Sequence, residues 1–439
     1  MGEKQQVVIR GSMVHIVDDP FLHPAKECLR YEPDGMIVVE DGKIVQSGPA
    51  ANILKTLPEG TDYETYQDKL IVPGFIDTHI HYVQTDIMGA FGKQLIDWLN
   101  TYTFTAEQKF KNPVEGKRVA EFFCDELLRN GTTTALTFCA TYPESVDQLF
   151  EAATKRNMRM IAGKVMMDRN APKGLEDTAK GSYEDSKELI KKWHKKGRNL
   201  YAITPRFAPT STPDELEVAG KLWSEHPSTY VHSHLSENVD EIAWVKKLFP
   251  ERKGYLDVYD HYGLTGKRAV YAHGVHLTEA EMQHCYDTGT AISHCPTSNL
   301  FLGSGLFSLE KAKDARRPIE VGLGTDIGAG TSFSMLQTMN EAYKVAQLRK
   351  FPLDAIHTFF LATLGSARAL DLGDKLGTLE VGKEADFVIL DPLATPLLKE
   401  RMQFVSSIEE QLFVLMTMGD DRSVAATYIA GNKAYERGE

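Results

Sequence analysis

The chain has 439 residues, 42% of them hydrophobic and 25% charged, a composition typical of a folded enzyme and not of a disordered or fibrous protein. The formal net charge of −12 disfavours nucleic acid and anionic membrane surfaces as partners, because both carry negative charge themselves. We therefore expect a small neutral substrate, no nucleic acid and no membrane partner.

The N-terminal residues begin no apolar segment, and no run of about 18 apolar residues follows, so we expect neither export nor a membrane span. Gln6 stands where a myristoylation signal prefers Ser or Thr. The number of cysteines is odd and none forms a C-x-x-C pair, which favours reduced, buried thiols and a cytoplasmic protein. These cysteines are Cys28, Cys124, Cys139, Cys285 and Cys295.

Short β-like runs fill residues 1–72, and the Asp41-Gly42 pair between two of them is a strong hairpin signal. A similar texture returns in residues 378–439, for example at 385–390. The simplest interpretation is one small β domain built from both ends of the chain. The segment between them, 73–377, would then form a separate catalytic domain.

In that middle segment, apolar runs alternate with long charged segments of helical period, which is the rhythm of repeated βα units. Eight such units predict a (β/α)8 barrel of the TIM type. A doubly wound open sheet is the structural alternative, but the chain has no G-x-G-x-x-G after the first strand and no P-loop. The eight runs are 70–78, 132–138, 159–167, 200–208, 229–235, 269–275, 290–295 and 319–325.

Polar residues that can ligate a metal stand at the ends of several predicted strands, where barrel enzymes place their active sites. The first strand ends in Asp77 to His81, and residues two apart on a strand project to the same face. Both His79 and His81 could therefore reach one ion. The alternative is a pair of hydrogen-bonded surface histidines.

The fifth strand ends in His232 to Glu237, which offers an imidazole and, beyond the strand, a carboxylate. His232 and His234 share a face; we choose His234 as the ligand because it lies nearer the barrel mouth, and we expect His232 to be packed and hydrogen-bonded. The sixth strand ends at His273 and the eighth at Asp326. Together they predict a nitrogen and oxygen site suited to Zn²⁺ or Fe²⁺, with room for water.

We expect a single metal ion, because the fourth strand ends in Thr204 to Phe207 and offers no lysine or acid that could bridge a second one. Lys164, within the third strand, could bridge two ions if carbamylated. A snorkelling or salt-bridged lysine is the preferred interpretation.

The sequence motifs of this chain resemble those of the amidohydrolase superfamily over nearly the whole chain. The motifs that carry the resemblance are Pro73 to His81, His234, His273, Gly324 to Asp326 and Gly382 to Asp386. A second set resembles the members of that superfamily that deaminate guanine. This set comprises Asp77 to His81 with Gln84, Trp98-Leu99 with Tyr102 to Phe104, Asn130 to Ala135, Thr204 to Phe207, His234 to Asn238, His294 to Leu300 and Gly419 to Arg422.

The resemblance implies a barrel with a β-sandwich domain, a homodimer, one Zn²⁺ per chain with Fe²⁺ as an alternative, and hydrolysis of guanine by water to xanthine and ammonia. It assigns the metal ligands as His79, His81, His234 and Asp326, and the catalytic groups as Glu237, His273 and Asp326. The residues that it places against the purine are Gln84, Arg206, Phe207 and Glu237.

Two alternatives remain open at the level of the sequence. Another amidohydrolase acting on cytosine, an amino-triazine or a cyclic amide would differ only in pocket residues. A non-catalytic scaffold that kept the barrel is the remote alternative, since it would have little reason to keep the whole set of ligands and acids. The aromatic residues Trp98, Tyr102 and Phe104 could stack on a ring in the pocket, but we expect them in the hydrophobic core.

Overall fold

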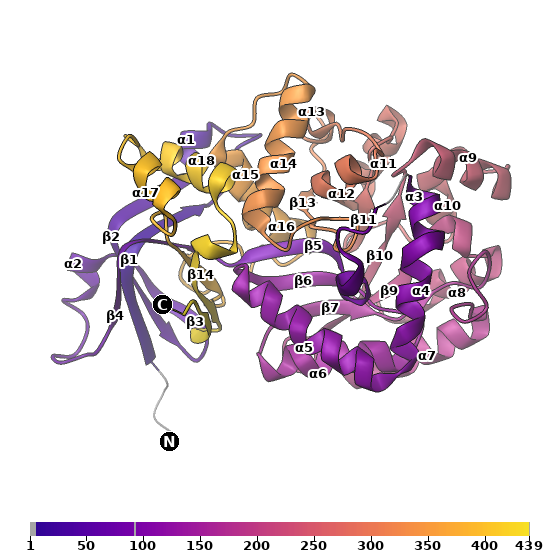
Figure 1. Ribbon diagram of the computed structural model, residues 1–439, viewed down its shortest axis with the longest axis horizontal. Helices are drawn as coiled ribbons and strands as arrows, with labels where there is room; N and C mark the ends of the chain where they lie inside the picture. The colour runs from indigo at the N-terminus through magenta and orange to yellow at the C-terminus, as the bar shows by residue number, and fades with distance from the viewer. Residues whose placement is uncertain (1–5, 92–93, 439) are drawn as a thin grey trace.

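The computed structural model describes residues 6–91 and 94–438, and two sheets organise them (Figure 1). A parallel barrel occupies one lobe of the molecule, and a mixed sheet built from both ends of the chain occupies the other. The predicted fold class, a TIM-type barrel with a small β domain from both chain ends, is therefore confirmed.

The barrel strands follow the chain in order around the sheet, with β8 pairing only with β9. Every residue of β6 is buried, as expected of parallel strands covered on both faces. The strands are β5 (Phe75–His81), β6 (Thr132–Phe138), β7 (Arg159–Gly163), β8 (Val165–Met166), β9 (Leu200–Pro205), β10 (Tyr230–Leu235), β11 (Ala269–His273), β12 (Ala291–His294) and β13 (Val321–Leu323).

The helices around the barrel begin at polar caps that the sequence supplies. Asn238 and Glu241 form a capping box at the start of α9, and Thr278 and Glu281 form another at α11. The helices are α5 (Pro113–Arg129), α6 (Pro143–Lys155), α7 (Ala179–Trp193), α8 (Pro213–Glu225), α9 (Val239–Leu248), α10 (Tyr255–His261), α11 (Glu279–Thr288), α12 (Pro296–Phe301), α13 (Leu309–Ala312), α14 (Met335–Leu348), α15 (Ala355–Ala362) and α16 (Leu364–Ala369).

A long segment of short helical turns separates β5 from α5 and lies at the end of the barrel where the strands finish. Residues from it line the pocket described below. Its elements are η1 (Tyr82–Ile87), α3 (Leu95–Trp98), η2 (Leu99–Thr103), α4 (Phe104–Gln108) and η3 (Lys109–Lys111). We call residues 82–111 the covering segment; residues 92–93 within it are not described.

The barrel closes between its first strand and the chain that follows its last strand. Asp326 N donates to His79 O at 2.9 Å, and His81 N donates to Ile327 O at 2.8 Å. Closure therefore fixes Asp326 beside the two histidines of β5. The predicted first run, 70–78, is wrong in its extent: residues 70–73 belong to β4 of the other sheet, and the barrel strand is 75–81.

The mixed sheet contains seven strands in the order β16-β15-β14-β4-β1-β2-β3. Its middle strand, β4, joins the two ends of the chain, because it pairs in parallel with β1 and antiparallel with β14. Asp41 and Gly42, both with positive φ, form the predicted hairpin turn. The strands are β1 (Gln6–Ile16), β2 (Leu29–Glu40), β3 (Lys43–Pro49), β4 (Glu64–Pro73), β14 (Phe387–Leu390), β15 (Val424–Ile429) and β16 (Asn432–Glu436), with helices α1 (Ala25–Cys28), α2 (Ala50–Ile53), α17 (Pro396–Met402) and α18 (Ile408–Met418).

A largely buried ion cluster joins the barrel to this sheet. Arg159 at the start of β7 and Arg198 before β9 both reach Glu384, at 2.6 Å each, and Arg198 also reaches Asp386. Both acids belong to the Gly382 to Asp386 motif of the sequence. That motif therefore lies at the junction of the two sheets, beside the start of β7.

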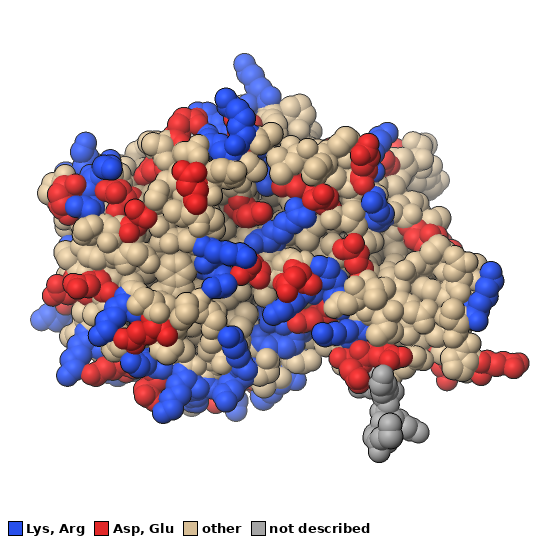
Figure 2. Space-filling model, turned by 180° about the vertical axis from the view of Figure 1, so that it is seen from behind, with Lys and Arg blue, Asp and Glu red and all other residues tan. Residues whose placement is uncertain are grey.

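The surface carries charges of both signs. On the face drawn in Figure 2, Lys and Arg side chains lie among Asp and Glu side chains. All five cysteines are free and buried, as predicted. Within residues 6–91 and 94–438, no helix combines the length and the apolar character needed to cross a membrane.

Candidate active site

Three imidazoles and a carboxylate converge at the ends of the barrel strands. His81 Nε2 lies 3.2 Å from both His79 Nε2 and His234 Nε2. Asp326 Oδ1 lies 3.1 Å from His79 Nε2 and 3.3 Å from His81 Nε2. The strand alternation of β5 and the closure of the barrel thus bring the four predicted ligands together, and the three histidines form a group that could hold a metal ion.

The second nitrogen of each imidazole has its own partner. His234 Nδ1 donates to the main-chain oxygen of Arg206 at 2.7 Å, and His79 Nδ1 lies 2.8 Å from His232 Nε2. Gln84 Nε2 lies 3.1 Å from His81 Nδ1. These contacts orient all three rings with Nε2 toward the common point. His232 is therefore packed and hydrogen-bonded, as expected, and its partner is His79.

Burial sets the charge of this cluster. Burial is the main cause that lowers the pKa of all three histidines. The pKa of His81 falls to about 3 and that of His234 falls well below the ordinary value, and for both residues the neighbouring histidines act in the same direction. Burial alone would raise the pKa of Asp326, but His79 and His81 hold it well below its usual range. Neutral imidazoles beside an ionised carboxylate are the protonation states that a metal ion requires. This donor set fits a zinc or ferrous ion.

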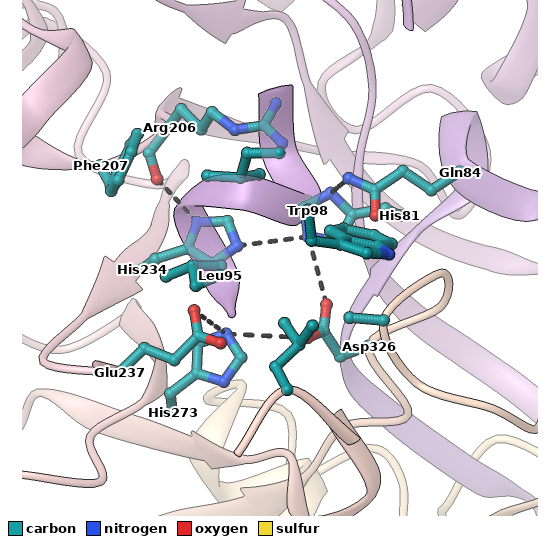
Figure 3. Close-up of a pocket in the computed structure, with 13 residues that line it drawn as sticks. His81, Gln84, Leu95, Trp98, Arg206, Phe207, His234, Glu237, His273 and Asp326 are labelled. Carbon is teal, nitrogen blue, oxygen red and sulfur yellow. Dashed lines mark hydrogen bonds and ion pairs between the residues drawn. The ribbon is translucent and has the colours of Figure 1, made fainter. Parts of the chain in front are cut away.

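A second acid stands across from Asp326. Glu237, two residues beyond β10, is buried, and its Oε2 lies 3.4 Å from His273 Nε2 (Figure 3). Ser304 Oγ donates to its Oε1 at 3.2 Å. Glu241 accepts the backbone N–H of Glu237 at 2.9 Å, so the cap of α9 also fixes the loop that carries this acid.

Burial, together with the charge of Asp326, raises the pKa of Glu237 to about 8. A carboxyl group held protonated near neutral pH can donate a proton to a bound molecule. His273 lies between the two acids, with Nε2 3.7 Å from Asp326 Oδ2. Its Nδ1 donates to Asn299 Oδ1 at 2.8 Å, which fixes the ring and leaves Nε2 facing the pocket.

The strand ends that carry these groups have unusual backbone conformations. His273 has φ +76°, Asp326 +52° and Ser236, next to Glu237, +48°. Side chains with a Cβ rarely occupy this left-handed region, and such strain concentrates at functional sites. From these turns the side chains of His273 and Asp326 line the pocket.

The opposite wall of the pocket carries an arginine and an amide. Figure 3 shows Arg206 and Gln84 across the pocket from Glu237 and His273. Arg206 Nη1 donates to Glu107 Oε2 at 2.7 Å, and Gln84 Nε2 donates to Glu107 Oε1 at 3.0 Å. Phe207 also lines the pocket, and apolar side chains complete it: Leu95, Trp98, Leu99, Leu302 and Ala329. The pocket holds about 390 Å³ of space not filled by atoms, its open mouth included.

All nine predicted site residues lie at this one place; eight line the pocket, and His79 is buried beneath it. Lys164 points elsewhere and forms an ion pair with Asp177, in agreement with the preferred interpretation. Phe104 and Trp98 are in the hydrophobic core as expected, Tyr102 packs against it, and Trp98 also forms part of the pocket wall.

Sequence reasoning missed three polar residues that hold the site residues: Glu107, Asn299 and Ser304. Asn299 stands in the quoted His294 to Leu300 motif, which could have pointed to it. Glu107 lies on the short helix α4, where no periodic pattern marks it as buried.

Comparison with known proteins relates the chain to one family and to several solved structures. The sequence profile of the amidohydrolase family matches residues 70–434. Guanine deaminase of Escherichia coli (strain K12) is 53% identical over 439 residues, which cover 99% of each chain, and its solved structure superposes with a TM-score of 0.96 over 98% of this chain and 100% of that chain.

Two more solved structures resemble the chain over almost its full length. Guanine deaminase from C. acetobutylicum, with guanine bound in its active site, is 29% identical with a TM-score of 0.88, covering 98% of this chain and 100% of that chain. An adenosine deaminase from Xanthomonas campestris with bound zinc is 25% identical with a TM-score of 0.83, covering 97% and 92%.

Proposed function

The chain belongs to the amidohydrolase family, and from this premise we propose that it hydrolyses the exocyclic amine of guanine to give xanthine and ammonia. The observation that carries the proposal is the pocket itself. It sets a metal-ligand cluster and a protonated acid on one side and an arginine and an amide on the other, with apolar side chains between them.

The metal ligands in this proposal are His79, His81, His234 and Asp326, and the ion is one zinc per chain, with ferrous iron as the alternative. A metal ion bound there would supply water activation, since it lowers the pKa of its bound water to about 7. The chemistry of the donors supports the assignment, because each imidazole keeps a neutral nitrogen directed at the common point.

The remaining steps belong to side chains of the protein. Asp326 takes the proton of the attacking water, and Glu237 delivers a proton to guanine N3, which makes C2 more electrophilic. A positioned shuttle of this kind contributes on the order of 10²–10⁴ in rate. His273 Nε2, between the two acids, stabilises the charge that develops at the attacked carbon. Asp326 then passes the proton that it took from water to the amine, which leaves as ammonia, and the remaining hydroxyl proton at C2 returns to Glu237 as the carbonyl of xanthine forms.

Recognition in this proposal depends on Arg206. A guanidinium only donates hydrogen bonds, and guanine offers acceptors at O6 and N7. Adenine would present an amino donor at position 6 to the same group, leaving buried donors unpaired. Gln84 and Phe207 contact the ring from the neighbouring wall, and Glu237 holds the edge that reacts.

Ammonia release from guanine, adenine, cytosine and an amino-triazine by metal-loaded protein tests the proposal. We expect guanine to exceed each other compound by at least about 10²-fold in kcat/KM. A preference for cytosine or the triazine would replace guanine with that substrate, and the absence of ammonia from all four compounds would remove the activity.

We propose a β-sandwich domain formed by residues 1–72 and 378–439, and a catalytic barrel domain formed by 73–377. We also propose a cytoplasmic homodimer. Sedimentation of the purified protein tests the dimer, and the resemblance to the family supports it.

A further inference from the structure

Within the described residues, Glu107 is the one acid whose carboxylate contacts both Arg206 and Gln84, and both of its oxygens are in use. Oε2 accepts from Arg206 Nη1 at 2.7 Å and Oε1 accepts from Gln84 Nε2 at 3.0 Å. Glu107 and Arg206 are almost completely buried, with side-chain exposures of 0% and 3%. The ion pair between them is therefore shielded from bulk water.

The chemistry of these contacts requires an ionised carboxylate. A carboxylate offers acceptors on both oxygens, whereas a protonated acid would turn one oxygen toward a donor. Gly328 N donates to Gln84 Oε1 at 3.2 Å, so the Gln84 amide is held at both ends. Glu107 is thus the common anchor of the two polar groups across the pocket from Glu237.

The same carboxylate offsets the charge of Arg206. Among the described residues, Arg206 makes no second ion pair, and its guanidinium carbon lies 5.4 Å from the centre of the Phe104 ring. With Glu107 in place, the pair presents directed N–H donors and almost no net charge. A neutral purine is then held by hydrogen bonds, and an anion gains little.

We propose that Glu107 is a positioning residue that orients Arg206 and Gln84 toward a neutral purine and prevents Arg206 from retaining the anionic product. The proposal rests on the proposed function. Xanthine carries an N–H between two carbonyl groups and is therefore a stronger acid than guanine, so part of it is anionic at mildly alkaline pH. An arginine without its counter-charge would hold that anion.

The substitution Glu107→Gln tests both halves of the proposal. It removes the charge and one of the two acceptors while keeping the size of the side chain. We expect KM for guanine to rise at least about tenfold, kcat to change less than about threefold, and metal content to stay at the wild-type value. The ratio of kcat/KM for guanine over 2-aminopurine, which lacks O6, should fall at least about fivefold.

Xanthine inhibition supplies the readout that a structural role would not give. We expect xanthine to inhibit Glu107→Gln at least about threefold more strongly than the wild type at pH 9, with a smaller difference at pH 6, because only the anion gains from an unbalanced arginine. Glu115→Gln is the matched control: Glu115 is in an exposed ion pair with Arg118, and its variant should match the wild type in every measurement.

Glu107→Asp covers the case in which Glu107→Gln does not fold. Its carboxylate keeps the charge but is one methylene shorter, so we expect the purine ratio to fall without tighter xanthine inhibition. The proposal is overturned if folded Glu107→Gln binds guanine and xanthine equally more weakly. It is also overturned if Glu107→Asp keeps the wild-type KM and purine ratio. A wild-type protein inert toward guanine would instead overturn the proposed function.

Discussion

The two halves of the pocket are built in different ways. The chemical half, defined by the four proposed metal ligands with Glu237 and His273, stands on the ends of parallel strands or within three residues of them. The recognition half, defined by Gln84, Trp98, Glu107, Arg206 and Phe207, takes three of its five residues from the covering segment between β5 and α5. Repeating barrel geometry fixes the first half, and irregular turns fix the second.

This contrast teaches that the two halves can change independently. The strand ends set the distances between ligands, so a substitution there alters chemistry. The covering segment sets which ring fits, so a substitution there alters selectivity. We therefore expect substitutions in the chemical half to change kcat, and substitutions in the recognition half to change KM and selectivity.

The largest effect is expected from the ligands. His79→Ala and His234→Ala should each lose the metal and reduce kcat by at least about 10⁴-fold, because a site with two imidazoles cannot hold the ion or activate water. Elemental analysis and ammonia release measure this. His284→Ala is the control, since that histidine bonds Asp260 on the outside of the barrel. Stoichiometric metal in both ligand variants would contradict the assignment.

A smaller loss is expected at the acid. Glu237→Gln should reduce kcat at least about 10²-fold while KM changes less than about threefold and metal is retained. The amide keeps the oxygen that accepts from Ser304 but cannot shuttle a proton. Steady-state kinetics with guanine decide the matter. Unaltered kcat would remove Glu237 from the mechanism.

On the recognition side, Arg206→Ala should reduce the guanine over 2-aminopurine ratio at least about tenfold, mainly through weaker activity on guanine. The main-chain oxygen of Arg206 remains in this variant, so the bond to His234 and the metal should survive. The measurement is kcat/KM for both purines at equal metal content. A parallel fall in both activities would make Arg206 a structural residue.

The smallest effect on activity is expected from an acid outside both halves. Glu215 on α8 is buried with one oxygen unbonded in the described chain, and burial together with the Asp168 charge raises its pKa to about 8, the same value as for Glu237. Glu215→Gln should leave kcat unchanged. A loss of kcat comparable to that of Glu237→Gln would contradict the conclusion that position in the pocket, and not a raised pKa, makes an acid catalytic.

Stability should reveal what Glu215 does instead. Its folded pKa lies above the unfolded value of 4.5, so its contribution to stability is full below pH 4.5 and is lost as pH rises through 8. The loss is on the order of 4 kcal/mol. Thermal melts should thus show Glu215→Gln gaining about 5 °C on the wild type between pH 5 and 9. An equal difference at both pH values would contradict this.

The sequence predicted the chemical half of the site because strand alternation is a geometric rule. His79 and His81 had to share a face, and residues at the ends of parallel strands had to meet at one end of a barrel. The fold class followed from the same periodicity. The extent of the first strand did not, because a continuous apolar run hides the change from β4 to β5 at Gly74.

The recognition half could be predicted only through resemblance. Short turns of four to six residues carry no detectable period, so nothing in the pattern around Glu107 tells a buried anchor from an exposed acid. Trp98 was ambiguous for a related reason: a pocket wall and a hydrophobic core use the same apolar side chains. Nor does the pattern identify Glu107 as the partner of Arg206, since the two residues lie 99 positions apart in the sequence.

The pairing of β4 with both β1 and β14 has a consequence for biosynthesis. The ribosome releases β1 to β4 first, yet the free edge of β4 finds its neighbour only when residues 387–390 emerge, more than 300 residues later. During that interval the nascent chain exposes an unpaired strand edge, a template for aggregation. The barrel must therefore be made before the sheet beside it can close, and the last strands to be synthesised complete the first sheet that was begun.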